Sequence, residues 1–572
     1  MKPRVFLPAV ASGLLLWAAF FPLNLGFLAF AALVPWLTLV RADVSRRRRY
    51  FAAYVGSVAF FLPATQWIRV AHPMMHFAWI GLALMCPVYW CVALFLLRRI
   101  DRLKCVPFAL SVPVVFVALE YVRAHFPNGF AFLQHVGLYQ LVGFGWYFLG
   151  YTQHEFLPLV QIADVGGVYA VSFVVGAVNG LAFDWFLSRR SETARPIVAT
   201  AVVALVFAGA VGYGFARLNH APFAEGPRVA AIQASVSQSD KMDQEKTGDL
   251  FDKYDDLCLR AAASGVDLVV WPETCYPHGW WTIDPRLDAA SVPREMTEAV
   301  RIHRGVVKLF ASGKVDGFTP NPKLAVPPPW KTNVLLGTNG YEWEGKRTVP
   351  TNTALLVNAD GDPVGRYDKM HLVPFGEYVP FRETLPWLQT FTPYKDDYSC
   401  RPGTEYTRFE FKARDKRYVF GCLICYEDSD PYLARQYVAP LPKLPKTNWE
   451  KVDFLVNISN DGWFDGTEEH EQHLAICRFR AIEARRSVVR AVNMGISAVI
   501  DPDGRVIALP GETWSKSKKI DGIVTANVPL DARESAYARF GDWVPGGCWA
   551  LLTVGHLAGV RQRRRAAKGF TA

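Results

Sequence analysis

Long apolar runs dominate the first 220 residues of the chain, and one more lies close to its end. A helix needs about 20 apolar residues to cross a bilayer, and eight runs approach that length. We therefore predict eight membrane spans, of which the first two are divided by Pro8, Pro22 and a break at Asn24–Gly26. The predicted spans are 5–21, 24–41, 52–70, 76–97, 106–124, 157–187, 196–216 and 543–560.

The first 20 residues also resemble a secretory signal peptide, because Ala9-Val10-Ala11 has the small-residue pattern of a cleavage site. The apolar stretch before these residues is short for a signal peptide, and further spans follow it. We therefore expect the first span to be retained.

Residues 222–540 have a different pattern, in which short apolar strands alternate with amphipathic helices, as in an α/β domain. Two Asp-Gly pairs, Asp360-Gly361 and Asp503-Gly504, predict turns between paired strands. A Pro-rich surface loop is expected at 318–330. The predicted strands include "RVAAIQASV" (228–236), "DLVVWPET" (267–274), "KRYVFGCLIC" and "VDFLVNIS", and helices are predicted up to about residue 263 and at 470–487.

Composition and charge fit this division. The chain is 51% hydrophobic and only 20% charged, which is unusually apolar for a soluble protein of 572 residues. Lys and Arg cluster in alternate loops between spans, which predicts that both termini are cytoplasmic and that 222–540 is extracytoplasmic. These clusters also explain the net charge of +10, so it does not indicate nucleic-acid binding. No Gly-rich phosphate loop or dinucleotide-binding fingerprint occurs.

Three chemically useful residues close predicted strands: Glu273 in "VVWPE", Lys369 in "GRYDK" and Cys425 in "FGCLIC". Strand ends of an α/β layer open onto the crevice where chemistry usually occurs. A lysine lowers the pKa of a nearby thiol and can stabilise an oxyanion, and a carboxylate can take and return the thiol proton. Each residue alone also fits an ordinary role, as a surface acid, a turn cation or a buried thiol.

The motifs around these residues suggest a family. "WPET", "DKMHLVPFGEYVP" and "ICYED", in this order, resemble the Glu-Lys-Cys triad of the nitrilase superfamily. With "VNISNDGWF" (456–464) and the surrounding spans, nearly the whole chain resembles the apolipoprotein N-acyltransferase family. The resemblance implies a multi-pass α-helical membrane domain at 1–220 with seven spans and a nitrilase-like α/β domain, an αββα sandwich, at 222–540. It also implies an eighth span at 543–560 and a basic cytoplasmic tail at 561–572.

The resemblance also implies roles for individual residues. Cys425 is the expected nucleophile, Glu273 the general base and Lys369 the cation that stabilises the oxyanion. Glu377, in "PFGEY", is expected to assist this triad from a mobile loop. Further positions match residues beside the nucleophile or near the site: Tyr426, Glu427, Asn460, Asp461 and Trp463. Positions behind the site fit a structural role as well as a catalytic one: Gln472, His473, Arg480, Glu483 and Asn493.

The sequence departs from the family pattern at Ser237, Met242 and Cys275, where proline, tryptophan and alanine are usual. Residues 278–330 are also longer than typical. These departures bear on acyl-chain contacts and substrate entry rather than on the triad.

Cys422 and Cys425 had three other interpretations: a disulfide, half of a metal site, or two core thiols. Three positions apart on a strand that leads into a turn, they face opposite sides and pair poorly, although an oxidising compartment would permit a disulfide. A zinc site needs two more ligands, and none is obvious. We interpret Cys425 as the nucleophile and Cys422 as a core residue.

The implied reaction transfers a fatty acyl chain from a membrane phospholipid, through a Cys425 thioester, to the N-terminal amine of a diacylated apolipoprotein. No cofactor or metal is implied, and the expected location is the bacterial inner membrane with the catalytic domain in the periplasm. Trp280-Trp281 and "LPWLQTF" (385–391) are candidate lids at the membrane interface.

Two alternatives use the same features differently. A membrane-tethered nitrilase or amidase would hydrolyse a small C–N substrate with the same triad. A transporter with an external binding domain would need polar residues within the spans, where few occur: Glu120, Asp164 and Asp184.

Overall fold

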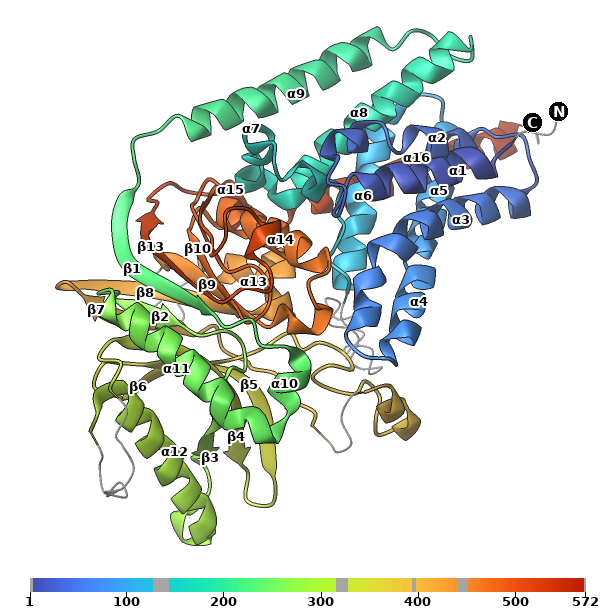
Figure 1. Ribbon diagram of the computed structural model, residues 1–572. Coiled ribbons are helices and arrows are strands. Elements are labelled where there is room, and N and C mark those ends of the chain that lie inside the picture. The colour runs from blue at the N-terminus through green and yellow to red at the C-terminus, as the bar shows by residue number, and fades with distance from the viewer. Residues whose placement is uncertain (1–3, 127–142, 315–327, 393–397, 441–450, 570–572) are drawn as a thin grey trace. The chain divides into compact units, whose positions relative to one another are not determined.

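The computed structural model describes residues 4–126, 143–314, 328–392, 398–440 and 451–569 (Figure 1). Most of the predicted Pro-rich loop lies outside these ranges. The chain forms two compact units, which are described one at a time. A helical unit comprises Met1–His220 and Ser535–Ala572, and an α/β unit comprises Ala221–Glu534.

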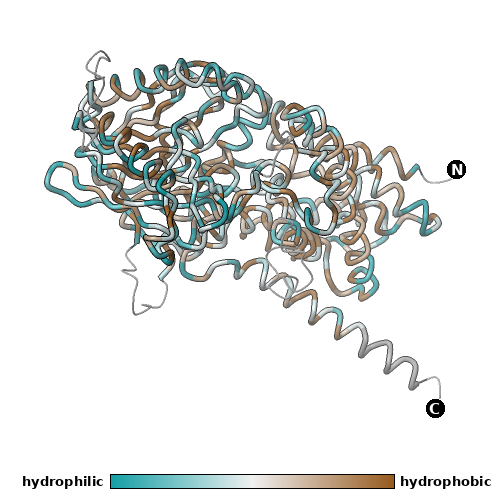
Figure 2. The backbone as a smooth tube through the Cα atoms, turned by 90° about the horizontal axis from the view of Figure 1, so that it is seen from below, coloured by the Kyte–Doolittle hydropathy of each residue, from teal (hydrophilic) through white to brown (hydrophobic). Residues whose placement is uncertain are grey.

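The helical unit contains, within the described residues, four helices long and apolar enough to cross a membrane: Met75–Asp101, Phe108–His125, Ala163–Arg189 and Ile197–Leu218. They overlap the predicted spans 76–97, 106–124, 157–187 and 196–216. Figure 2 shows brown, hydrophobic residues along the helices of this unit. By length and composition, these helices are consistent with a membrane protein. The count of eight spans stays a prediction, because Phe6–Ala18 and Gly26–Val40 form shorter apolar helices.

The elements of this unit follow one another in a simple order. Its α-helices are α1 (Phe6–Ala18), α2 (Val34–Leu37), α3 (Arg46–Ala64), α4 (Met75–Met85), α5 (Pro87–Asp101), α6 (Phe108–His125), α7 (Leu157–Val160), α8 (Ala163–Arg189), α9 (Ile197–Leu218), α15 (Ala536–Phe540) and α16 (Trp543–Gly569). Its 3-10 helices are η1 (Gly26–Phe30), η2 (Thr38–Val40), η3 (Gln66–Val70) and η6 (Leu149–Gln153). Pro87 begins α5, because a proline in the first turn of a helix sacrifices no hydrogen bond.

Three acids in the helical unit contact neighbouring elements of the same unit. Asp184 accepts hydrogen bonds from the backbone N–H groups that begin α6, at 3.0 and 2.9 Å. Glu120 Oε1 accepts one from Leu149 N–H at 2.7 Å, and Asp164 pairs with Arg217 at 2.8 Å. These acids therefore stabilise the unit's own fold, which removes the main feature expected of a transporter.

The α/β unit is built from two sheets. The first sheet has the order β13-β1-β2-β4-β5-β6, with β3 also paired to β4, and the second has the order β12-β11-β10-β9-β8-β7. In each sheet, three parallel strands (β1-β2-β4, and β8-β9-β10) are flanked by antiparallel partners. Hairpins form at both predicted Asp-Gly turns, between β5 and β6 and between β11 and β12.

The strands and helices of this unit have the following bounds. The strands are β1 (Ala224–Gln233), β2 (Leu268–Val270), β3 (Tyr276–Ile283), β4 (Asn333–Trp343), β5 (Thr348–Val357), β6 (Pro363–Asp368), β7 (Arg408–Ala413), β8 (Lys416–Ile424), β9 (Phe454–Ser459), β10 (Val488–Val492), β11 (Ala498–Ile500), β12 (Val506–Ala508) and β13 (Gly522–Leu530). The helices are α10 (Gln238–Met242), α11 (Thr247–Ala263), α12 (Arg294–Ser312), α13 (Pro431–Gln436) and α14 (Glu469–Ala484), and the 3-10 helices are η7 (Gln244–Lys246), η8 (Ala289–Ser291), η9 (Pro386–Phe391), η10 (Cys425–Ser429), η11 (Asp461–Phe464) and η12 (Ser515–Ser517).

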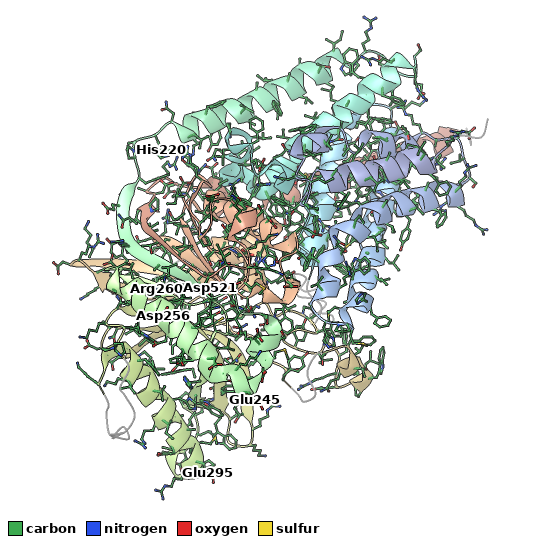
Figure 3. The ribbon with its side chains drawn as sticks, in the orientation of Figure 1. His220, Glu245, Asp256, Arg260, Glu295 and Asp521 are labelled. Carbon is green, nitrogen blue, oxygen red and sulfur yellow. The ribbon has the colours of Figure 1, made fainter. Side chains whose placement is uncertain are left out.

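Alternation along the strands produces the layers. In β1, Val229 and Ala231 face a core shared with the second sheet, whereas Ala230 and Ile232 face a core shared with α11 and α12. The second sheet packs α13 and α14 against its other face. The resulting order is helices, sheet, sheet, helices, the expected αββα sandwich (Figure 1). The outer surface of α11 carries polar residues such as Asp256 and Arg260, an exposed ion pair (Figure 3).

The two candidate lids differ. Trp280 lies in β3 with 4% of its surface exposed, packed in the core with α11 and α12, so it is not a membrane-facing lid residue. Trp387 in η9 is 60% exposed, so a lid at the membrane interface stays a prediction for this segment.

Candidate active site

The general-base candidate lies just beyond a central strand of the first sheet. Glu273 follows β2, and its backbone passes directly over Gly337 of β4. A Cβ at Gly337 would lie 2.0 Å from Pro272 O and 2.8 Å from Glu273 Cα. Only glycine therefore permits this close approach, which carries Glu273 into the interior.

Lys369 forms the centre of a buried charge cluster at the end of β6. Its Nζ lies 3.1 Å from Glu273 Oε1 and 2.9 Å from Glu377 Oε2. Asn352 Nδ2, on β5, donates to Glu273 Oε1 and Glu377 Oε1, both at 2.7 Å. Two backbone N–H groups also donate to these carboxylates. Asn460 N–H donates to Glu273 Oε2 at 3.0 Å, and Val373 N–H donates to Glu377 Oε2 at 2.8 Å. The two carboxylates thus share one cation and one amide.

This pairing determines the protonation of the cluster. Burial alone would raise the pKa of Glu273 and lower the pKa of Lys369, but the attraction between the two charges outweighs it. The pKa of the Glu273 carboxyl therefore lies below its ordinary value, with Asn352 contributing, and the pKa of Lys369 lies well above its ordinary value. Glu273 is a carboxylate able to accept a proton, and Lys369 is a fixed cation.

Cys425 is the first residue of η10, directly after β8, and has a positive φ of 53°. A non-glycine residue in this region holds a strained turn, a common feature of functional sites. Burial and then Glu273 raise the pKa of the Cys425 thiol to about 12, against the opposing effect of Lys369. The expectation of a lowered thiol pKa was therefore wrong, because burial and the carboxylate outweigh the lysine. At neutral pH the group is a thiol, and it must lose its proton as it attacks.

Glu427 connects the Cys425 turn to the segment that follows Lys369. It is fully buried, and its two oxygens accept hydrogen bonds from Ile424 N–H (2.7 Å), Met370 N–H (2.7 Å), His371 N–H (3.1 Å) and the hydroxyl of Tyr367 (2.9 Å). Burial raises the pKa of Glu427, while these N–H donors oppose the shift. The structure therefore places Glu427 as a brace between β6 and β8.

The other residues expected at the site differ in their contacts and in how deeply they are buried. Asn460 touches the triad through its backbone N–H, and its side chain is bound by Asn493 Nδ2 at 2.8 Å. Tyr426 in η10 and Trp463 in η11 are half-buried. Arg480 Nη1 donates to Asp428 O at 3.1 Å and also pairs with Glu483. Asp461 and His473 contact each other at 3.2 Å, as described below, and Gln472 is buried beside His473 in the chain.

The three departures from the family pattern have clear positions. Ser237 caps α10, where its Oγ accepts from Asp240 N–H at 3.1 Å. Met242 is 46% exposed at the end of the same helix. Cys275 is buried and receives hydrogen bonds from the Tyr254 hydroxyl at 3.0 Å and from Lys241 Nζ at 3.6 Å.

Two polar residues that sequence reasoning missed belong to the site. Asn352, on β5, donates to both carboxylates, although no motif in the sequence singles it out. Lys241 donates to Glu273 O at 2.9 Å and Thr274 Oγ1 at 2.7 Å, and so holds the turn that carries the base. No local signal distinguishes either from an ordinary surface residue.

The alternative interpretations of the cysteines find no support in the contacts. All ten cysteines lie in described residues and are free, and Cys422 packs in the core between the sheets. Asp461, Glu469 and His470 lie close enough to hold a cation. However, Gly466 N–H donates to His470 Nε2 at 2.9 Å, so a neutral imidazole carries its proton on Nδ1. Because Arg490 also holds Asp461, the donor set suits a metal poorly.

Profiles of two protein families match the chain. "Apolipoprotein N-acyltransferase N-terminal domain" matches residues 12–181, and "Carbon-nitrogen hydrolase" matches residues 228–538. The second match covers the α/β unit with all three triad candidates, and the first lies in the helical unit.

Curated relatives match along almost the whole chain. A protein of Geobacter metallireducens named apolipoprotein N-acyltransferase is 30% identical over 96% of this chain and 94% of its own length. Proteins of the same name from Rhodopirellula baltica and Caulobacter vibrioides are each 28% identical, over 96% and 90% of this chain and 95% and 87% of their own lengths. Among solved structures, an amidase from Nesterenkonia sp. is 16% identical over 56% of this chain and 95% of its own, with a TM-score of 0.34, too low to carry an argument.

Proposed function

Because the chain belongs to the apolipoprotein N-acyltransferase family and is an enzyme of lipoprotein N-acylation, we propose that Cys425 carries the acyl group between two half-reactions. Glu273 is the general base and Lys369 the oxyanion-stabilising cation. The observation that supports this assignment best is the buried Glu273–Lys369–Glu377 cluster at the strand ends of the first sheet, whose charges act on the Cys425 thiol at a strand end of the second sheet. No metal or cofactor enters the proposal.

In the first half-reaction, the acyl donor is a membrane phospholipid. Glu273 takes the thiol proton as Cys425 Sγ forms a bond to the ester carbonyl carbon. Lys369 Nζ stabilises the oxyanion that results. The ester C–O bond then breaks, and the departing lysophospholipid oxygen takes the proton from Glu273. The enzyme is left as a neutral thioester, with Glu273 again a carboxylate.

In the second half-reaction, the acceptor is the N-terminal α-amine of a diacylated apolipoprotein. The neutral amine attacks the thioester carbonyl, a C–N bond forms and the C–S bond breaks. Glu273 takes a proton from the nitrogen and returns it to Cys425 Sγ. The products are an amide and the resting thiol, so the cycle needs no further reactant.

Glu377 assists this cycle in the proposal. It is the second carboxylate on Lys369 and shares Asn352 with Glu273. When Glu273 becomes neutral by taking the thiol proton, Glu377 still balances the lysine charge. Tyr426, Glu427, Asn460 and Trp463 support the site around these groups, and Glu427 does so as the brace already described.

We further propose the bacterial inner membrane as the location, with seven spans before an extracytoplasmic catalytic domain at 222–540 and an eighth span after it. The Lys and Arg clusters in alternate loops support this orientation. Reporter fusions at Ser191 and Pro320 should then report opposite sides of the membrane. Equal behaviour of the two fusions contradicts the orientation.

The decisive experiment is mass spectrometry of the purified enzyme after incubation with phospholipid alone. We expect a mass gain of one fatty acyl group at Cys425, removable by hydroxylamine. A diacylated lipopeptide with a free N-terminus should discharge it, whereas the N-acetylated lipopeptide should not, because it offers no amine. Discharge at equal rates with both peptides identifies water as the acceptor and favours the hydrolase alternative.

A further inference from the structure

Four charged side chains lie fully buried behind the nucleophile, between the second sheet and α14. They come from four elements: Asp428 from η10, Asp461 from η11, His473 from α14 and Arg490 from β10. His473 contacts Asp428 at 2.8 Å through Nε2 and Asp461 at 3.2 Å through Nδ1. Arg490 contacts the same two carboxylates, at 3.4 and 2.8 Å. We call these four residues the charge tetrad.

Within the tetrad, the acidic and basic side chains shift one another's pKa values towards the charged forms. Burial and Arg490 oppose a charged His473, but Asp428 and Asp461 outweigh them, so the pKa of His473 lies well above its ordinary value. The pKa of Asp461 lies below its ordinary value, because His473 and Arg490 together outweigh burial. Asp428 and Asp461 each contact both His473 and Arg490. Glu469 also approaches His473, at 3.3 Å.

The tetrad reaches the nucleophile through one residue, Asn457. Leu423, Asn457 and Arg490 are direct neighbours across β8, β9 and β10, so their side chains share the helix-facing side of the sheet. Arg490 Nη1 donates to Asn457 Oδ1. This contact fixes the amide orientation, so that Nδ2 donates to Leu423 O and to Cys425 O, both at 3.3 Å. The carbonyl oxygen of the nucleophile itself is therefore held by a side chain whose orientation an arginine sets.

Stability alone gives no reason for this arrangement. Moving ions out of water costs several kcal/mol each, and a buried ion pair is often no more stabilising than well-packed apolar residues. What the contacts do achieve is geometric: they attach both ends of the strained turn, at Cys425 O and at Asp428, to neighbouring strands and to α14. A side chain 1 Å out of position can cost about 100-fold in rate.

We propose that Asn457, oriented by Arg490 and the charge tetrad, is a positioning residue that holds the Cys425 turn in its reactive conformation. This inference rests on the proposed role of Cys425 as nucleophile. Asn457 and Arg490 are both fully buried, so neither meets substrate. Their loss should therefore affect the reactivity of the thiol and leave substrate binding unchanged.

The test compares Asn457→Asp with Asn333→Asp in the full-length enzyme. Asn457→Asp keeps the shape and an acceptor for Arg490 but removes the N–H donors to Leu423 O and Cys425 O. Asn333→Asp is a matched control, because Asn333 Nδ2 likewise donates to a backbone carbonyl, Asp267 O at 2.9 Å, but in the first sheet. The readouts are the rate of Cys425 alkylation by iodoacetamide, followed by peptide mass spectrometry, and the rate and KM of acyl-enzyme formation. Asn457→Ala replaces the aspartate variant if that protein does not fold.

We expect the Asn457 variant to lose about tenfold or more in both alkylation and acylation rates, with an unchanged KM for phospholipid and a control near wild type. Wild-type alkylation and acylation rates in a folded Asn457 variant overturn the proposal, as does a change confined to KM. Alkylation separates the two hypotheses. If the wild-type enzyme alkylates but never acylates, the proposed function fails, while slower alkylation in the variant still supports positioning.

Discussion

The two sheets of the α/β unit contribute different kinds of group to one site. The first sheet and the loop after β6 supply charges that are already paired: Glu273 and Glu377 each contact Lys369, at 3.1 and 2.9 Å. The second sheet supplies a neutral thiol on a strained turn, with a pKa of about 12. Its charges lie behind the thiol, in the tetrad.

In the mechanism proposed above, this difference determines when Cys425 is activated. A stable thiolate–lysine pair would be reactive at all times, whereas here Lys369 is fully committed to two carboxylates. The thiol loses its proton to Glu273 only as it attacks. Once Glu273 is neutral, it no longer compensates the charge of Lys369, so this charge can stabilise the oxyanion.

The contrast between the two cysteines of β8 and η10 gives the largest expected effect. Cys425→Ser should lose at least about 10³-fold in acyl-enzyme formation, because Glu273, with its lowered pKa, is too weak a base for a hydroxyl. Cys422→Ser should remain active and lose about 1–3 kcal/mol of stability from a buried hydroxyl. Single-turnover mass spectrometry and thermal unfolding measure the two effects. An active Cys425→Ser enzyme contradicts the assignment of the nucleophile.

The charge cluster of the first sheet predicts an intermediate effect for Glu377→Ala. The substitution leaves Lys369 with Glu273 as its remaining carboxylate in the cluster, which strengthens that pair and makes Glu273 a poorer base. Turnover should fall by about 10²-fold while folding and membrane insertion are retained. Glu383→Ala, an exposed glutamate nearby in the chain, is the matched control. Near-normal turnover of Glu377→Ala would reduce this residue to a structural role.

The half-reactions should respond differently to pH, which is the smallest predicted effect. Glu273 is ionised and Cys425 is protonated throughout the neutral range, because their pKa values are lowered and raised respectively. Acylation by phospholipid should therefore be nearly constant from about pH 6.5 to 8.5 and fall only in acid, as Glu273 gains a proton. Transfer to the lipopeptide should rise about five- to eightfold from pH 7 to 8.5, as the α-amine with a pKa near 7.7–8.0 becomes neutral. Acylation that rises tenfold per pH unit would instead indicate attack by a pre-formed thiolate.

Much of the catalytic unit was predictable because strands and motifs are local. The apolar runs that became β1, β8 and β9 and the two Asp-Gly turns all appear where their patterns predicted them. The strand ends also predicted that Glu273, Lys369 and Cys425 lie close together: Glu273 and Lys369 pair at 3.1 Å, and both affect the pKa of Cys425, while the catalytic roles of the three residues stay predictions. Four of the predicted spans correspond to long apolar helices for the same reason.

Long-range contacts were not predictable, and they decide the chemistry. The pKa of Cys425 depends on how deeply the turn is buried and on its distance from Glu273, neither of which spacing reveals. Asn352 and Asn457 read as ordinary polar strand residues, because only the assembled sheets show which carboxylate or carbonyl each meets. The sequence suggested an interfacial aromatic at Trp280, whereas in the structure this residue lies in β3 and packs in the core.

The pairing of β1 with β13 has a consequence for biogenesis. These strands open and close the α/β unit, and their register joins Ala224 to Leu530 and Gln233 to Gly522. Contacts between such distant segments form late, because the whole intervening chain must first be available. β1 therefore cannot pair with β13 until the last part of the unit has been synthesised and delivered. During that interval its edge is an aggregation hazard, so we expect a chain that is truncated before β13 to be recognised by proteases rather than to accumulate as a partly active enzyme.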